Sequence, residues 1–132
     1  MRHRFIHYKL DLPVFDTEHF ALFKAMYECV RLIRHKEDIT AALHKLYLLM
    51  VAHTEHEETF LLDNDYPYFM DHKYSHDCIL SRLSELIKTK ATYMTEGLCH
   101  ELDRLIVSHI DHYDLMFKDY YKDRRLDTLI FK

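Results

Sequence analysis

Glycine and proline are scarce in this chain, which has one glycine and two prolines among its 132 residues. Sheet proteins built around many tight turns use both residues repeatedly, so their scarcity disfavours a sheet and favours a few long helices. The length suits one hydrophobic core, and we expect residues 1–132 to form a single domain. Hydrophobic residues make up 48% of the chain and charged residues 30%, which is typical of a globular protein rather than a disordered one.

Other absences exclude classes of function. The net charge is −4, which argues against a nucleic-acid partner, because phosphate contacts need a surplus of Lys and Arg. No run approaches the roughly 18 apolar residues of a membrane helix, and the N-terminus has no uninterrupted apolar segment of a signal peptide. One glycine cannot supply a glycine-rich phosphate loop, and no GxSxG motif occurs. Cys29, Cys78 and Cys99 are odd in number and far apart, so we expect reduced core thiols in a cytoplasmic protein.

Apolar residues recur at helical spacing in four segments. These predict helices over about residues 17–35, 38–62, 68–90 and 98–122. We expect Asp16 to cap the first helix, Pro67 to follow the end of the second, and Gly97 to lie in the break before the fourth. Four such helices with short connections predict an all-α fold, an up-down-up-down antiparallel four-helix bundle with an N-terminal arm and a short C-terminal tail.

Histidine is abundant, with twelve in the chain. Polar residues interrupt the apolar stripe of every predicted helix: His19 early in the first, His53 and Glu57 late in the second, His72 and His76 early in the third, and His109 late in the fourth. In an antiparallel bundle, early positions on odd helices and late positions on even helices lie at the same end. All four helices therefore bring imidazole or carboxylate to one level of the core.

A metal site explains this level better than a solvated face. About one pair of histidines four residues apart is expected by chance, and two occur. His3 and His7 have no apolar stripe around them and are interpreted as surface residues, whereas His72 and His76 lie on an inward stripe. A buried, unpaired Glu57 carboxylate would be costly, and a cation would account for it. Imidazole with carboxylate suits iron, manganese, zinc or copper, and the residues alone leave the metal open.

Neighbouring polar residues are more ambiguous. Asp114 follows His109 by five residues and points about 140° away on an ideal helix, so a solvated aspartate is at least as good an interpretation. His56 and His112 each follow a candidate ligand by three residues and could compete with it, although surface positions fit them better. The remaining polar candidates are interpreted as surface or supporting residues: His35, His44, His100, Glu55 and Glu58. No Glu-x-x-His pair of the ferritin type occurs.

Five motifs, in order along nearly the whole chain, resemble the hemerythrin family, and bacterial hemerythrin-like proteins most of all. They read "FDTEHFALF", "HTEHE", "YP", "HKYSH" and "HIDHYD". The resemblance implies one hemerythrin-like domain with a non-haem di-iron centre, joined by an oxo or hydroxo bridge. By position, it implies one iron on His72, His76 and His109, a second on His19 and His53, and bridging carboxylates from Glu57 and Asp114.

The resemblance also implies a function, because the iron with two histidines keeps one coordination position open. A cytoplasmic protein that reversibly binds dioxygen for carriage, storage or sensing is the leading expectation, with no protein partner indicated. An enzyme with peroxidase, ferroxidase or nitric-oxide-handling activity is the alternative. A sensory or structural module, in which the metal only holds the bundle together, is a third.

The expected ligand pocket departs from the family pattern at two positions. Leu22, Ile106 and Ile110 are its expected apolar lining. Thr54 stands where many family members have an aromatic residue, and Leu105 stands where many have tryptophan, which this chain lacks. A smaller and more polar residue at position 54 favours entry of water. This predicts faster autoxidation and keeps peroxide chemistry open.

Overall fold

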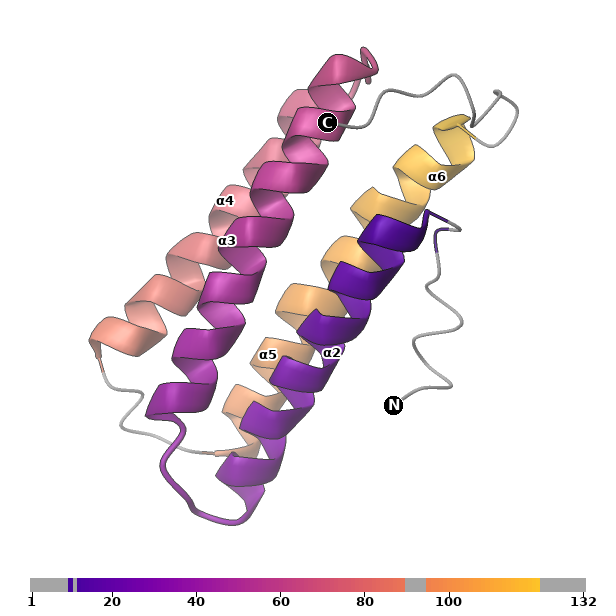
Figure 1. Ribbon diagram of the computed structural model, residues 1–132. Helices are drawn as coiled ribbons and strands as arrows, with labels where there is room; N and C mark the ends of the chain where they lie inside the picture. Colours follow the sequence, from indigo (N-terminus) through magenta and orange to yellow (C-terminus); the bar gives the residue numbers. More distant parts are fainter. Residues whose placement is uncertain (1–9, 11, 90–94, 122–132) are drawn as a thin grey trace.

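The computed structural model describes residues 10, 12–89 and 95–121, and the described part of the chain contains helices and no strand. The elements are α2 (Pro13–Arg34), α3 (Thr40–Asp63), α4 (Phe69–Lys88), α5 (Glu96–His109), the π-helical turn η1 (Ile110–Asp114) and α6 (Leu115–Tyr121). The last three form one continuous column. Helix α2 packs on α3 and α5, and α4 packs on α3 and α5, with neighbouring columns running in opposite directions (Figure 1). The predicted all-α four-helix bundle is confirmed.

The first helix begins earlier than expected. It starts at Pro13, a residue suited to a first helical turn because that turn has no partner for its N–H groups. Asp16 therefore lies inside the helix, and the prediction that it is the N-cap is wrong. Its carboxylate instead accepts a hydrogen bond of 2.6 Å from the backbone N–H of Leu10. This contact holds Leu10 against the beginning of α2.

Helices α2 and α3 end without glycine. After each helix one residue adopts the left-handed conformation, Lys36 with φ 56° and Asp65 with φ 54°. The next N–H reaches back over the helix end, from Tyr66 to the Leu61 carbonyl at 2.9 Å after α3, which is a Schellman motif. The single glycine lies elsewhere: Gly97 is in the first turn of α5, not in the break where it was expected. The chain thus turns twice on non-glycine residues.

Two apolar clusters enclose a polar layer. The larger fills most of the bundle and includes Phe23, Leu46 and Leu102, whereas the smaller lies at the end near α6 and includes Phe15 and Phe117. Each column passes from one cluster to the other and carries its buried histidines between them. The polar layer is therefore sealed by apolar side chains above and below.

Some expectations concern other parts of the chain. Cys29 and Cys99 are buried, but Cys78 is exposed, so the prediction of three core thiols is wrong for Cys78; all three are free. The N-terminal arm over residues 1–9, the C-terminal tail over residues 122–132, and the predicted helix ends at residues 90 and 122 lie outside the described residues. No described helix is long and apolar enough to cross a bilayer.

Candidate metal centre

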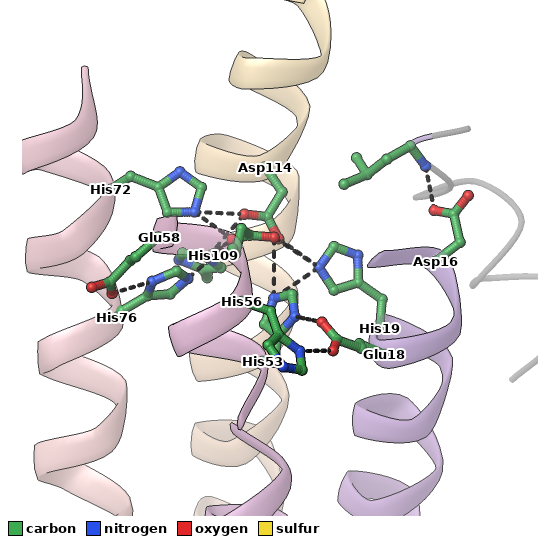
Figure 2. Close-up of polar contacts among 12 residues, drawn as sticks. Asp16, Glu18, His19, His53, His56, Glu58, His72, His76, His109 and Asp114 are labelled. Carbon is green, nitrogen blue, oxygen red and sulfur yellow. Dashed lines mark hydrogen bonds and ion pairs between the residues drawn. The ribbon is translucent and has the colours of Figure 1, made fainter. Parts of the chain in front are cut away.

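The polar layer holds seven buried side chains contributed by all four columns of the bundle. They are His19, His53, Glu57, His72, His76, His109 and Asp114. Each lies on the inner face of its helix, directly between residues of the two apolar clusters. The structure thus brings together every residue that the sequence analysis nominated as a metal ligand, and Figure 2 shows the side chains converging.

Glu57 lies at the middle of the cluster. Its Oε1 atom is 2.6 Å from His72 Nε2 and 3.1 Å from His76 Nε2. Its Oε2 atom is 3.1 Å from His53 Nε2 and 3.5 Å from His19 Nε2. One carboxylate oxygen therefore faces the histidines of α4, and the other faces those of α2 and α3.

Asp114 repeats this division from the opposite column. Its Oδ1 atom lies 2.9 Å from His72 Nε2 and 3.0 Å from His109 Nε2, and its Oδ2 atom lies 3.0 Å from His19 Nε2. These short contacts are not aligned as hydrogen bonds, so neither oxygen has a hydrogen-bond partner among the described residues. Metal-ligating atoms approach one another in this way, closely but without hydrogen-bond alignment, when they all point at a common centre.

The donor atoms fall into two groups that share the carboxylates. One consists of His72, His76 and His109 with Glu57 and Asp114, and the other of His19 and His53 with the same two acids. Within each group, the ligand atoms all lie within 4.8 Å of one another. Two cations placed side by side would each meet imidazole nitrogen and carboxylate oxygen, with three imidazoles for one cation and two for the other.

The family model for the hemerythrin HHE cation-binding domain matches residues 11–121. The chain belongs to the hemerythrin family. It is 26% identical over 91 residues to bacteriohemerythrins from two strains of Campylobacter jejuni, of serotypes O:6 and O:2, and this stretch covers 67% of the chain and 68% of each relative. No solved structure matches the chain. Family membership and the cluster of histidines and acids together support a di-iron-binding protein.

The outer nitrogens of this hemerythrin centre also have partners. His53 Nδ1 lies 2.9 Å from Glu18, His76 Nδ1 lies 2.8 Å from Glu58, and His109 Nδ1 lies 2.7 Å from the Ser75 hydroxyl. A carboxylate only accepts hydrogen bonds, so His53 and His76 carry hydrogen on Nδ1 and, when neutral, present the Nε2 lone pair to the centre. Supporting hydrogen bonds of this kind fix the ring orientation of metal-binding histidines.

Two of these supporting residues were missed by the sequence analysis. Glu58 was expected to be solvated or supporting, and it supports His76. Glu18 and Ser75 were not singled out, because each contact crosses from one helix to another and spacing along one helix does not reveal it. Each is the residue just before a candidate ligand, which is the one pattern that could have drawn attention to them.

The electrostatics of the hemerythrin centre favour a cation. Burial alone would raise the pKa of the Glu57 carboxyl, but the surrounding imidazoles, His53 and His72 first, hold that pKa well below its usual range. Burial would lower the pKa of His53, whereas the nearby Glu57 carboxylate and the hydrogen bond to Glu18 raise it to about 10. Without metal, protons on the imidazoles balance the buried acids. Metal ions would replace those protons, and the mixed nitrogen and oxygen donors suit iron.

The π-helical turn explains why Asp114 joins the centre. An ideal α-helix would turn this residue away from His109, which is why a solvated position looked equally plausible. The chain instead forms η1 over Ile110–Asp114, and Asp114 is fully buried. A π turn closes from residue i to residue i+5, so Asp114 returns to nearly the face occupied by His109. A local widening of one turn thus supplies the second shared carboxylate.

The other described histidines lie outside both donor groups. His35, His44, His56, His100 and His112 are all exposed, in agreement with their interpretation as surface residues. His56 nevertheless has a specific partner, because its Nδ1 atom lies 2.5 Å from the Glu18 carboxylate.

Most of the residues expected to line a ligand pocket are buried. Leu22, Ile106 and Ile110 belong to the larger apolar cluster, and Leu105 is half-buried against it. Thr54 is 6% exposed, and its hydroxyl has no hydrogen-bond partner among the described residues. The polar group at position 54 is therefore buried rather than directed to solvent.

Proposed function

We propose that this chain binds dioxygen reversibly at a pair of iron ions, with His72, His76 and His109 on one, His19 and His53 on the other, and Glu57 and Asp114 shared. The unequal division of imidazoles carries the proposal. Both metal positions share the two carboxylates, so the position formed by His19 and His53 has one protein ligand fewer than the position formed by His72, His76 and His109. That difference leaves room there for a small external ligand.

Iron bound in this donor set would supply the electrons and the coordination position that dioxygen needs. The chain supplies the surroundings. Glu57 and Asp114 each direct one oxygen to either donor group and so hold the two positions adjacent. Leu22, Ile106 and Ile110 keep water from the buried layer, which protects a bound ligand from expulsion.

Anaerobic loading with ferrous iron, followed by exposure to oxygen, tests this function. We expect a visible charge-transfer band that disappears when oxygen is removed and returns when it is restored. Glu57→Gln, which removes one shared carboxylate, should abolish the band, whereas His44→Gln at an exposed histidine should leave it unchanged. Protein that binds iron stoichiometrically without any reversible band would contradict the proposal.

A second candidate is an enzyme with peroxidase, ferroxidase or nitric-oxide-handling activity at the same centre. The buried Thr54 hydroxyl supports it, because a polar group in an otherwise apolar pocket can hold water or a proton donor beside a bound ligand. Many turnovers with peroxide or ferrous iron, in place of a stable oxygen-dependent band, would favour this candidate. For either function, the free thiols at Cys29, Cys78 and Cys99 support a reducing compartment such as the cytoplasm.

A further inference from the structure

Glu18 lies on α2 and contacts two histidines of α3. Its Oε1 atom is 2.9 Å from His53 Nδ1, and its Oε2 atom is 2.5 Å from His56 Nδ1 (Figure 2). The Glu18 side chain is 21% exposed and that of His56 is 60% exposed, whereas His53 is buried. The three residues thus form a hydrogen-bonded line from the protein surface to a candidate metal ligand.

Both oxygens of Glu18 are committed by this arrangement. Partial burial would raise the pKa of the Glu18 carboxyl, but the hydrogen bonds to His53 and His56 lower it, so the group is a carboxylate. His53 and His56 are one helical turn apart and direct their Nδ1 atoms to the same carboxylate. His56 therefore holds Glu18 in the orientation that His53 requires. An exposed pair of this kind contributes little to stability, so orientation is its more consequential effect.

The two donor groups depend differently on such support. In the group with three histidines, His76 is held by Glu58 and His109 by Ser75. In the group with two histidines, His53 is held by Glu18, whereas His19 Nδ1 has no hydrogen-bond partner among the described residues. Loss of Glu18 would leave neither ring of the smaller group oriented by such a hydrogen bond. Loss of Glu58 would leave one ring of the larger group still held.

We propose that Glu18 and His56 are positioning residues for the metal position formed by His19 and His53, and that they set the metal affinity of that position separately from its neighbour. The proposal rests on the proposed function only in requiring that metal bind at both positions. Residues that support a metal-binding histidine typically contribute about 10- to 100-fold to metal affinity. An exposed histidine outside the ligand set would thereby tune the position at which the external ligand binds.

Zinc titration of the metal-free protein, with a competing chelator, tests the proposal in wild type and variants. We expect two binding steps, the weaker at the position with two histidines. Glu18→Gln keeps the shape of the side chain but leaves one acceptor oxygen for two N–H donors. It should weaken the second step by about 10- to 100-fold and leave the first unchanged. Glu58→Gln is the matched control and should weaken the first step instead.

His56 provides an independent pair of variants at an exposed position. His56→Ala should weaken the second step by less than Glu18→Gln does, whereas His56→Gln should restore it, because an amide N–H can still donate to Glu18. Circular dichroism and thermal unfolding of each metal-free variant establish that the bundle is intact. Should Glu18→Gln fail to fold, the contrast between the two His56 variants decides the question.

Equal weakening of both steps by Glu18→Gln, or no weakening of the second step by Glu18→Gln and His56→Ala, would overturn the proposal. Zinc does not bind dioxygen, so these results do not depend on the oxygen chemistry. A protein that fails to show a reversible oxygen band could still show the predicted zinc steps. A protein with a reversible band but an unaltered second step would disprove the positioning role alone.

Discussion

At the scale of single residues, Thr54 is a buried polar side chain that stands apart from the network of histidines and acids. It follows the candidate ligand His53, is buried, and has a hydroxyl without a hydrogen-bond partner among the described residues. Leaving a buried hydroxyl unsatisfied costs about 1–3 kcal/mol relative to a satisfied one. Such a cost is expected to persist where the polar group serves the site rather than the fold.

Thr54→Val, which replaces the hydroxyl with a methyl group of similar size, is expected to raise the free energy of unfolding by about 1 kcal/mol. The drier pocket should also slow the decay of the oxygen-dependent visible band. Urea denaturation and the decay rate of the band measure the two effects. Thr59→Val, at an exposed position of the same helix, is the control and should change stability by no more than about 0.5 kcal/mol. Destabilisation by Thr54→Val would mean that the hydroxyl is satisfied in solution.

At the scale of the elements, the π-helical turn η1 is the feature that adapts the bundle to its centre. Besides Ile110, which directly follows His109, the buried positions of the column after His109 are Asp114, Phe117 and Tyr121. The first step is five residues and the later ones are three and four. One extra residue is thus absorbed within η1, and α6 keeps its apolar face on the smaller cluster.

Deletion and insertion in η1 should have opposite outcomes. Removing the exposed Asp111 would convert the turn to an ordinary α-helix that still places the aspartate on the His109 face, so the bundle and metal binding should survive. Inserting an alanine after Asp111 would rotate Asp114 and all of α6 by about 100°. Metal content by mass spectrometry should then fall, and loss of Phe117 from the core should cost about 3–5 kcal/mol of stability. Equal loss of metal in both variants would contradict this account.

At the scale of the whole molecule, the order of layers controls the chemistry. Two apolar clusters exclude solvent from a layer that holds five imidazoles and two carboxylates. In that layer charges are costly unless balanced, so protons or metal ions must compensate the acids. Folding, protonation and metal binding are therefore linked across the entire bundle.

The metal-free protein should lose stability as the pH rises. Burial lowers the pKa of His53 and His72, but interactions led by the Glu57 carboxylate raise both to about 10, above the ordinary value of 6.5. The stabilisation from these protons is complete below about pH 6.5 and is lost as the pH rises toward 10. The pKa values of Glu57 and Asp114 are lowered, so their contribution is lost instead in acid.

Thermal unfolding of the metal-free protein, measured at a series of pH values from about 5 to about 10, should show the melting temperature falling above about pH 6.5. Metal binding should release protons, and zinc affinity should rise over the same range, because metal displaces protons from the imidazoles. Zinc-loaded protein is the comparison, since its ligand nitrogens are no longer free to titrate. A melting temperature of the metal-free protein that is constant from about pH 6.5 to 10 would contradict the linkage.

The amino-acid sequence by itself determined the class of fold and most of the candidate site. Scarce glycine and proline and four apolar stripes at helical spacing dictate a helical bundle. His19, His53, Glu57, His72, His76 and His109 were recognisable because each interrupts an inward stripe at a common level. Periodicity along one helix carries that information, since every regular turn places residues in the same way.

Tertiary structure decided what periodicity does not encode. Asp114 enters the centre through a π turn, and an ideal helical repeat places it outside. Glu18 and Ser75 become supporting residues because the packing of neighbouring helices brings Glu18 to His53 and Ser75 to His109. Asp16 sits inside α2 because the helix begins at Pro13. Contacts between helices and local departures from the α-helix depend on how all four columns pack, and no single segment specifies them.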